Sequence, residues 1–350
     1  MTTIKEVARR AGVAPSSVTR VLSGHPNVSD ALRAKVLAAV EEIGYRPDLL
    51  AAGLRRGSSH TVGVIVSDII NPLLAEVVDA LDVRLRDQNY TVLLANSHGD
   101  PARDVESVHL LRQRRTDGMI VMVVDETRPE LQRALRDLPM PVVLLDRQIE
   151  GVDAASAVLS DHHRGTRELT LHLLDAGHER LAMLRGLRGT TYPGQERTRG
   201  FVSALTERGI PPEAATILDA RPTIEAGQRL AGQLLDSDDP PTAIVVGPNP
   251  MLTGVLQEVQ RRGLRVGRDL ALACLDEVPI AALYQPPITT LYRDIQEMAH
   301  TAATLLLDRL TGASRYPRTV VLPTSVRLRG STTMMDPRAR PESSPARLPS

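Results

Sequence analysis

The sequence predicts a small all-α helix-turn-helix headpiece, followed by an α/β body built as two doubly wound parallel sheets. Two observations favour this division. Residues 1–60 contain short helical patterns and carry a net charge of +4, whereas the remaining 290 residues carry −4. From residue 61 onward, apolar runs typical of strands alternate with amphipathic helical stretches, which predicts parallel sheets covered on both faces. A length of 350 residues accommodates both parts.

The composition excludes several classes of protein. Cys274 is the only cysteine, so the chain forms no internal disulfide and no zinc site of several cysteines. No apolar run reaches ten residues and the N-terminus lacks a secretory signal, so we expect a cytoplasmic protein. His162 and His163 are adjacent, so they do not share a helix face as a pair of metal ligands would. No nucleophile elbow, zinc-protease motif or phosphate loop occurs, and we expect no catalytic residue, no metal and no cofactor.

The first helix is predicted from its cap and its period. Thr3 and Glu6 have the spacing of a capping box, in which each side chain bonds the other's free backbone N–H. Apolar residues then recur on one helix face, from Ile4 to Ala11. Gly12 is predicted to end the helix.

A second helix is predicted to begin at Pro15, because proline suits the first turn of a helix. The short separation from the first helix is typical of a helix-turn-helix. The polar positions of this second helix offer hydroxyls and a guanidinium, which suit phosphates and guanine edges in a major groove; they are Ser16, Ser17, Thr19 and Arg20. The spacing alone also allows a corner of two helices with a solvated face, and the charge excess alone allows ordinary local fluctuation.

A third helix is predicted after Ser29, which can act as its N-cap. Its inward residues are expected to be Leu32, Val36, Leu37, Val40 and Ile43. Residues 48–60 follow as a segment too short to be a stable helix alone, joined to a linker. We interpret it as a conditional helix between two domains.

The body is predicted from residue 61 to residue 330. The expected strands are Thr61–Val66, Thr91–Ala95, Met119–Val124, Val142–Asp146, Leu181–Leu184, Ala243–Val246 and Leu270–Cys274. The expected helices are Leu73–Arg86, Val105–Arg114, Thr166–Ala176, Arg197–Arg208, Ile224–Leu235, Leu252–Arg262 and Ile295–Leu310. Two such domains commonly bind a ligand in the cleft between them. Residues 336–350 are rich in Pro, Ser and Arg, and we expect residues 331–350 to be a disordered tail that adds no further subunits.

These motifs resemble the lac repressor/galactose repressor family of bacterial transcription regulators. The head carries the resemblance from Thr3 to Ala8, from Ser17 to Gly24, at Asn27–Ser29 and from Ile43 to Pro47. The body carries it at Val62–Val66, Asn71-Pro72, Asp117-Gly118, Gly177-His178, Arg197 with Gly200-Phe201, and Pro286–Thr290. The resemblance covers about residues 2–330 in one register.

The resemblance implies a headpiece over 1–47, a hinge helix and linker over 48–60, and an effector-binding and dimerisation body over 61–330. The body is similar to two-lobed periplasmic binding proteins, with three crossovers between lobes. The family binds near-palindromic operator DNA as dimers, with the second helix in the major groove and the hinge leucine, here Leu54, in the minor groove. The implied DNA contacts are Thr3, Pro15, Ser16, Ser17, Thr19, Arg20, Ser23, Asn27, Ala51, Leu54 and Arg55.

The family's effector site matches this chain only in part. Asp146, Arg197 and Asp276 match polar ligand contacts, and Leu73 and Leu74 stand where the family has aromatic residues. Other roles stay open: an Asp146–Arg147 ion pair, a helix-to-loop tie by Arg197, and a cap or salt bridge by Asp276. Leu73 and Leu74 equally suit a core or a lobe interface. The loss of aromatic plates predicts discrimination against simple hexoses, so the effector, a sugar or related metabolite, stays unidentified and could be absent.

We therefore expect a dimeric repressor of transcription that binds a palindromic operator and responds to a small-molecule effector. A solute-binding protein with the same body is the alternative, and the headpiece disfavours it. A third hypothesis, an enzyme that uses the α/β body, is disfavoured because the sequence contains no recognisable set of catalytic residues. The sequence leaves open the operator, the regulated genes and whether the effector releases or tightens DNA binding.

Overall fold

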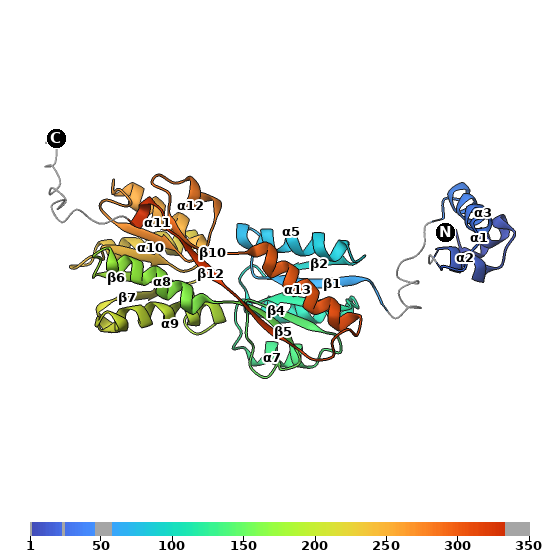
Figure 1. Ribbon diagram of the computed structural model, residues 1–350, viewed down its shortest axis with the longest axis horizontal. Helices are drawn as coiled ribbons and strands as arrows, with labels where there is room; N and C mark the ends of the chain where they lie inside the picture. Colours follow the sequence, from blue (N-terminus) through green and yellow to red (C-terminus); the bar gives the residue numbers. More distant parts are fainter. Residues whose placement is uncertain (1, 23–24, 46–57, 333–350) are drawn as a thin grey trace. The chain divides into compact units, whose positions relative to one another are not determined.

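The computed structural model describes residues 2–22, 25–45 and 58–332. The chain divides into two compact units, with the boundary between Ser59 and His60. We describe each unit by itself (Figure 1). Most of the predicted hinge segment and of the predicted tail lies outside the described residues. Among the described helices, none combines the length and the apolar character needed to cross a membrane.

The first unit contains three helices, α1 (Ile4–Ala11), α2 (Pro15–Leu22) and α3 (Asp30–Glu42). The predicted capping box is confirmed, because the Thr3 hydroxyl accepts from Glu6 N and the Glu6 carboxylate accepts from Thr3 N. Gly12 ends α1 with a φ of 60°, a conformation that glycine adopts without strain. Side chains from all three helices form one apolar core, with Val7, Val18 and Val36 completely buried.

One inward residue predicted for α3 was wrong. Leu37 is 48% exposed, whereas Ala39 is buried. The buried side of α3 follows Leu32, Val36, Ala39 and Ile43, which are spaced by three or four residues. Leu37 lies about 100° around the helix from Val36, so an apolar side chain there faces solvent.

The second unit contains two lobes, each built on a six-stranded sheet. The first-lobe sheet has the order β11-β5-β4-β3-β1-β2 and is parallel throughout. Its strands are β1 (Thr61–Val66), β2 (Thr91–Asn96), β3 (Gly118–Met122), β4 (Val142–Leu145), β5 (Ser156–Ser160) and β11 (Thr319–Leu322). Its helices are α5 (Pro72–Arg86), α6 (Pro101–Gln113), α7 (Pro129–Arg136) and α13 (Ile295–Leu310).

The second-lobe sheet has the order β12-β10-β9-β8-β6-β7, and only β12 runs antiparallel to its neighbour. Its strands are β6 (Leu181–Arg185), β7 (Thr216–Asp219), β8 (Ala243–Val246), β9 (Ala271–Cys274), β10 (Thr289–Arg293) and β12 (Thr324–Arg327). Its α-helices are α8 (His162–Asp175), α9 (Tyr192–Glu207), α10 (Ile224–Leu235), α11 (Asn249–Arg261) and α12 (Pro279–Leu283), with short 3-10 turns at Pro212–Ala214 and Gly330–Thr332.

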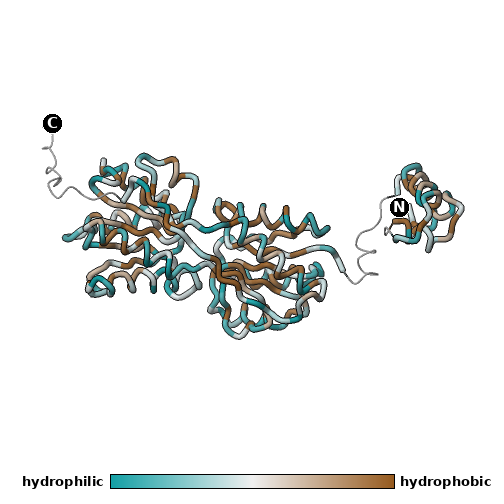
Figure 2. The backbone as a smooth tube through the Cα atoms, viewed as in Figure 1, coloured by the Kyte–Doolittle hydropathy of each residue, from teal (hydrophilic) through white to brown (hydrophobic). Residues whose placement is uncertain are grey.

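Each sheet has an apolar core on both faces. In the first lobe, α5 and α13 pack on one face, and α6 and α7 pack on the other. In the second lobe, α10, α11 and α12 cover one face, and α8 and α9 cover the opposite one. Figure 2 shows the hydrophobic segments concentrated in the strands of both lobes. This layering explains why the central strands are apolar without alternation.

Three crossovers join the lobes, at Asp161 between β5 and α8, Asp294 between β10 and α13, and Pro323 between β11 and β12 (Figure 1). Two of them are hydrogen-bonded side by side, because Asp161 N donates to Leu322 O over 2.9 Å and Thr324 Oγ1 donates to Asp161 O over 2.9 Å. The expected number of crossovers is confirmed. They place the carboxyl ends of both parallel sheets toward each other, which is where such folds bind ligands.

The sequence pattern missed five strands, namely β5, β7, β10, β11 and β12. Most lie near a sheet edge or contain Ser, Thr, Tyr or Arg, so they form no purely apolar run. The pattern also missed α7 and α12, which have eight and five residues.

A close helix contact in the second lobe gives a stability prediction. At Gly254 on α11, an added Cβ would lie 1.9 Å from Ile224 O and 2.5 Å from Gln228 N. Both are backbone atoms of α10 or its first turn, so the helices must separate. We expect Gly254→Ala to lower the free energy of unfolding by about 3 kcal/mol or more, measured by urea denaturation.

Gly232 on α10 provides the matched control. An added Cβ there would meet only the ends of two side chains, those of Glu258 at 3.2 Å and Arg262 at 3.7 Å. Alanine also favours a helix over glycine, so Gly232→Ala should leave stability unchanged or raise it by up to about 1 kcal/mol. Equal effects of the two substitutions would contradict the close packing of α10 against α11.

Candidate functional site

The headpiece presents polar side chains along α2. Pro15, Ser16, Thr19 and Arg20 are exposed, while Ser17 is half-buried. Val18 and Val21 point into the core instead. The apolar side of α2 therefore fixes the helix against α1 and α3, and the side predicted to contact DNA is open to solvent.

Two of these side chains are already engaged within the headpiece. The Thr19 hydroxyl donates to the Pro15 carbonyl over 3.1 Å, and Arg20 Nη2 donates to the Asn27 carbonyl over 3.1 Å. Arg20 thus ties the end of α2 to the following loop, where Asn27 is also exposed. Thr3, at the N-cap of α1, is exposed as well. The remaining predicted contacts lie outside the described residues; they are Ser23, Ala51, Leu54 and Arg55.

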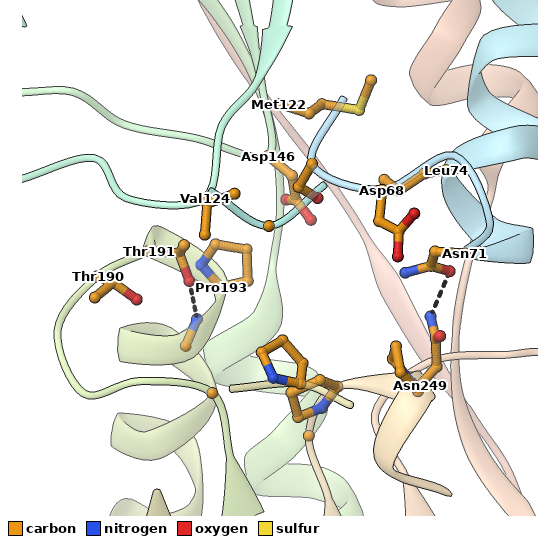
Figure 3. A pocket seen from close by; sticks show the side chains of 18 of the residues that line it. Asp68, Asn71, Leu74, Met122, Val124, Asp146, Thr190, Thr191, Pro193 and Asn249 are labelled. Carbon is orange, nitrogen blue, oxygen red and sulfur yellow. Dashed lines mark hydrogen bonds between the residues drawn. The ribbon is translucent and has the colours of Figure 1, made fainter. Parts of the chain in front are cut away.

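A second candidate site lies between the lobes of the body, at the carboxyl ends of both sheets. A cavity of about 330 Å³ opens there, and we call it the cleft cavity. Its lining includes all five predicted effector residues, Leu73, Leu74, Asp146, Arg197 and Asp276. Figure 3 shows Met122, Leu74 and Asp146 from the first lobe on one side, and Thr191, Pro193 and Asn249 from the second lobe on the other.

Asp276 is the hydrogen-bond centre of the second-lobe side. Its Oδ1 accepts from Arg197 Nη2 and from Arg293 Nη2, each over 2.6 Å. Its Oδ2 accepts from the backbone N and from the side-chain Nδ2 of Asn249, each at 3.3 Å. The carboxylate therefore joins the ends of β9 and β10 to the second turn of α9 and to the first residue of α11.

Asp146 is the corresponding carboxylate of the first lobe. Its Oδ2 lies 2.6 Å from Arg293 Nη1 and 2.8 Å from His162 Nε2, and its Oδ1 accepts from Ser160 N over 3.0 Å. The residue has a φ of +53°, an uncommon conformation for a side chain other than glycine. Backbone strain at this position turns the chain sharply at the end of β4 and directs Asp146 across the crossovers.

His162 completes a five-membered polar network. Its Nδ1 accepts from Arg197 Nε over 3.3 Å, which assigns the proton to Nε2, the atom facing Asp146. Burial lowers the pKa of His162 to about 4, although Asp146 opposes that shift. The ring is therefore neutral near pH 7. We call Asp146, His162, Arg197, Asp276 and Arg293 the cleft network; each is at most 7% exposed.

The cleft network is electrically balanced. Burial raises the pKa of Asp276, but Arg197 and Arg293 outweigh it and hold the pKa below its ordinary range. Burial likewise opposes ionisation of Asp146, whose pKa is nevertheless lowered by His162 and Arg293. Two carboxylates and two guanidiniums thus cancel. Such pairing is required, because an unpaired buried charge costs several kcal/mol.

The structural roles that the sequence left open are partly present. Arg197 donates to Gly247 O over 2.9 Å and to Leu275 O over 3.0 Å, so it does tie α9 to neighbouring loops. Asp276 does form a salt bridge. The Asp146 carboxylate, by contrast, pairs with Arg293, whereas Arg147 donates to the Asp146 backbone carbonyl and to Val123 O. Contact of these residues with an effector stays a prediction.

The apolar part of the cleft cavity contains no Phe or Tyr side chain. Leu73 packs into the core of the first lobe and also lines the cavity, and Leu74 is half-buried there. Met122 and Val124 continue this wall, and Pro193 lies opposite (Figure 3). The expected loss of aromatic plates is therefore present in the lining, while discrimination against hexoses stays a prediction.

Sequence reasoning missed four side chains of this site, His162, Arg293, Glu126 and Asn71. His162 and Arg293 border strands β5 and β10, which contain polar residues and were not recognised. Asp146 was identified from the family resemblance and follows a purely apolar strand, whereas β5 and β10 form no such apolar run. No group of His, Cys, Asp and Glu with metal-binding geometry occurs in the described part of the chain.

Glu126 bridges the lobes at one flank of the cavity. Its carboxylate accepts from Tyr192 N over 2.8 Å and from Gln148 N over 3.2 Å, and its own backbone N donates to Thr190 O over 2.8 Å. Burial raises the pKa of Glu126 to about 7, although Arg147, at 3.6 Å, opposes the shift. The group therefore titrates near neutral pH.

The raised pKa of Glu126 gives a pH-dependent prediction. The unfolded chain releases this proton near pH 4.5, whereas the folded chain keeps it until about pH 7. The folded state binds more protons in that window, so the contribution of Glu126 to stability falls as the pH rises. Relative to Glu126→Gln, which cannot ionise, the wild type should lose up to about 3 kcal/mol between pH 4.5 and pH 7.

The measurement is urea denaturation of both proteins across this pH range. His162 has the opposite slope, because its folded pKa is lowered and stability falls as the pH drops from about 6.5 to 4. Both proteins retain His162, so the difference between them isolates Glu126. A difference that stays constant with pH would show that Glu126 titrates normally.

Comparisons with known proteins match both the headpiece and the body of the chain. Residues 3–48 match the family of bacterial regulatory proteins of the lacI family, and residues 170–332 match a periplasmic binding protein-like domain. Catabolite control protein A of Priestia megaterium is 31% identical over 94% of this chain and 99% of its own length. The ribose operon repressor of Escherichia coli K12 is 29% identical over 95% of this chain and all of its own.

Solved structures extend the comparison to the fold. The lac repressor dimer bound to operator and the anti-inducer ONPF superposes with a TM-score of 0.81 at 26% identity, over 95% of this chain and 99% of that one. Because the match to catabolite control protein A spans nearly the full length of both chains and the headpiece matches the family's own model, this chain belongs to the lacI family of bacterial transcription regulators.

Proposed function

We propose that this chain is a repressor that binds a palindromic operator as a homodimer and is modulated by a small-molecule effector. The observation that carries the proposal is the exposed polar side of α2. The opposite, apolar side of α2 packs into the core of the headpiece and fixes the orientation of the helix. Hydroxyl and guanidinium groups on one helix suit a major groove. A regulator of this kind acts where the chromosome is, in the cytoplasm.

The proposed DNA contacts comprise residues of α1, α2, the following loop and the hinge segment. They are Thr3, Pro15, Ser16, Ser17, Thr19, Arg20, Ser23, Asn27, Ala51, Leu54 and Arg55. Thr3 stands at the N-terminus of α1, where backbone N–H groups attract a phosphate. Arg20 donates to the Asn27 carbonyl through Nη2, and a guanine edge would offer its guanidinium two acceptors side by side.

A dimer is favoured by the edge of the first-lobe sheet. β2 is the last strand of that sheet, and it exposes Leu93 and Leu94, which are 36% and 39% exposed. Leu110 on α6 is 47% exposed. An exposed edge strand with apolar side chains is a hazard unless a partner covers it. A second copy of the chain would cover it and would also double the recognition helices.

The cleft cavity is the proposed effector site, with Leu73, Leu74, Asp146, Arg197 and Asp276 in its wall. Its volume of about 330 Å³ is within the range of small-molecule sites. Among the similar solved structures, one regulator is in complex with cellobiose and another has bound ribose, which favours a sugar or a related metabolite here. We propose no enzymatic activity, because the relatives of this chain are regulators of transcription.

A fragment of residues 61–350 tests this function against the alternative of a solute-binding protein. We expect the fragment to fold and dimerise, because the lobes form a unit separate from the headpiece. It should lose operator binding, because it lacks α2. Gel-shift with DNA from upstream of its own gene measures binding, and light scattering measures the dimer. A fragment that shifts operator DNA as the intact chain does would refute the proposal.

Arg20→Ala tests the role of α2 at one position. If Arg20 reads a guanine, the substitution should weaken operator binding by about 1–3 kcal/mol and relax preference at one base per half-site. Binding to an operator series, followed by fluorescence anisotropy, measures both effects. Arg268→Ala is the control, because it removes an exposed charge from the body. It should change neither the affinity for the operator nor the base preference.

A uniform loss of affinity across all operators, with a smaller dependence on salt, would identify Arg20 as a phosphate contact instead.

A further inference from the structure

We infer that Arg293 takes the place of a ligand between the two lobes, so that the cleft network holds the lobes closed without an effector. This inference rests on the proposed function, because it concerns how the effector site is regulated. It makes Arg293 a positioning residue that sets the lobe arrangement.

Arg293 is placed to span the lobes. It is the last residue of β10, directly before the crossover at Asp294. Its planar guanidinium reaches Asp146 of the first lobe through Nη1 and Asp276 of the second lobe through Nη2, both over 2.6 Å. Its side chain is 6% exposed. A fork of two short, charge-assisted bonds in a buried site fixes both distance and orientation.

The two carboxylates have almost no capacity left for another donor. A carboxylate has about four lone-pair sites. Asp276 accepts from Arg197, from Arg293 and twice from Asn249. Asp146 accepts from Ser160 N, His162 and Arg293. The hydroxyl groups of a ligand would have to displace a protein donor to bind Asp276, and Asp146 keeps about one lone-pair site for them.

Further bridges hold the flanks of the cleft. At one end, Asn249 Nδ2 donates to Asn71 Oδ1 over 3.0 Å, which joins α11 of the second lobe to the N-cap of α5 of the first (Figure 3). At the other, Glu126 accepts from Tyr192 N and donates its own N–H to Thr190 O. The closed arrangement therefore has polar bridges at its base and on both flanks, all supplied by the chain.

The distance between lobes provides a readout that does not depend on DNA. Cys274 is buried and its thiol pKa is raised by burial to about 12, so dyes attach to introduced cysteines instead. Glu130→Cys on α7 and Glu225→Cys on α10 give one exposed site in each lobe. Single-molecule energy transfer is recorded on the full chain without small molecules, with labelled chains diluted so that each dimer holds one labelled copy.

We expect the unsubstituted network to give one compact distance population. Arg293→Gln keeps polar contacts but removes the charge, and a longer-distance population should rise at least about tenfold. Arg293→Lys keeps the charge, but an ammonium group offers no planar fork to two carboxylates. Its longer-distance population should therefore lie between those of the unsubstituted chain and of Arg293→Gln. Arg208→Gln is the matched control, because it removes an exposed ion pair with Asp175 inside the second lobe, and it should change nothing.

Two results would overturn the inference. One is a mixture of open and closed lobes in the unsubstituted chain. The other is a distance distribution of Arg293→Gln that equals that of the unsubstituted chain. If Arg293→Gln does not fold, as judged by circular dichroism, Asp146→Asn provides the same test from the other side of the bond. Operator binding is measured on the same samples. If the chain with an unsubstituted cleft network does not bind operator DNA, the proposed function is refuted. The distance distributions still decide the role of Arg293 in that case.

Discussion

The ion pairs of Arg293 with Asp146 and Asp276 are the interaction on which the body depends. Two lobes joined only by three crossovers could adopt many relative arrangements, because crossovers restrict position and leave rotation open. Arg293 removes that freedom by binding one carboxylate in each lobe at the point where the crossovers meet. Burial makes the arrangement exacting, because opening the bond without solvating the charges would cost several kcal/mol.

The backbone topology of the two sheets positions the residues of this site. Parallel strands end at one edge of each sheet, so polar residues after successive strands converge there. Asp146 follows β4 and Asp276 follows β9, while Arg197 reaches Asp276 from α9. The positive φ of Asp146 is the local strain that turns its carboxylate toward the other lobe. The parallel strands thus bring the polar residues to one edge of each sheet, and the strained backbone of Asp146 turns its carboxylate toward the other lobe.

The sequence predicted the headpiece and the layered body because both rest on local patterns. A capping box, a glycine stop and helical periodicity act within a few residues, and uninterrupted apolar runs mark the central strands. Asp146, Arg197 and Asp276 were identifiable because of the family resemblance. The role of Arg293 was not, because its partners are 147 and 17 residues away along the chain and its strand carries Thr, Tyr and Arg. The exposure of Leu37 was likewise not predictable from local pattern, because it depends on which side of α3 packs against the other two helices.

A self-held cleft constrains how an effector can act. A ligand shifts an equilibrium only by the difference in its affinity for the two states. If the closed state already dominates, a ligand that prefers it adds little, however tightly it binds. A ligand that engages Asp276 must displace one of its protein donors, and displacing Arg293 or Asn249 removes a bond between the lobes and favours an open arrangement. The chemistry of the cleft therefore favours an effector that opens the lobes over one that closes them, and the apolar walls of Leu74, Met122 and Pro193 are where it would gain affinity.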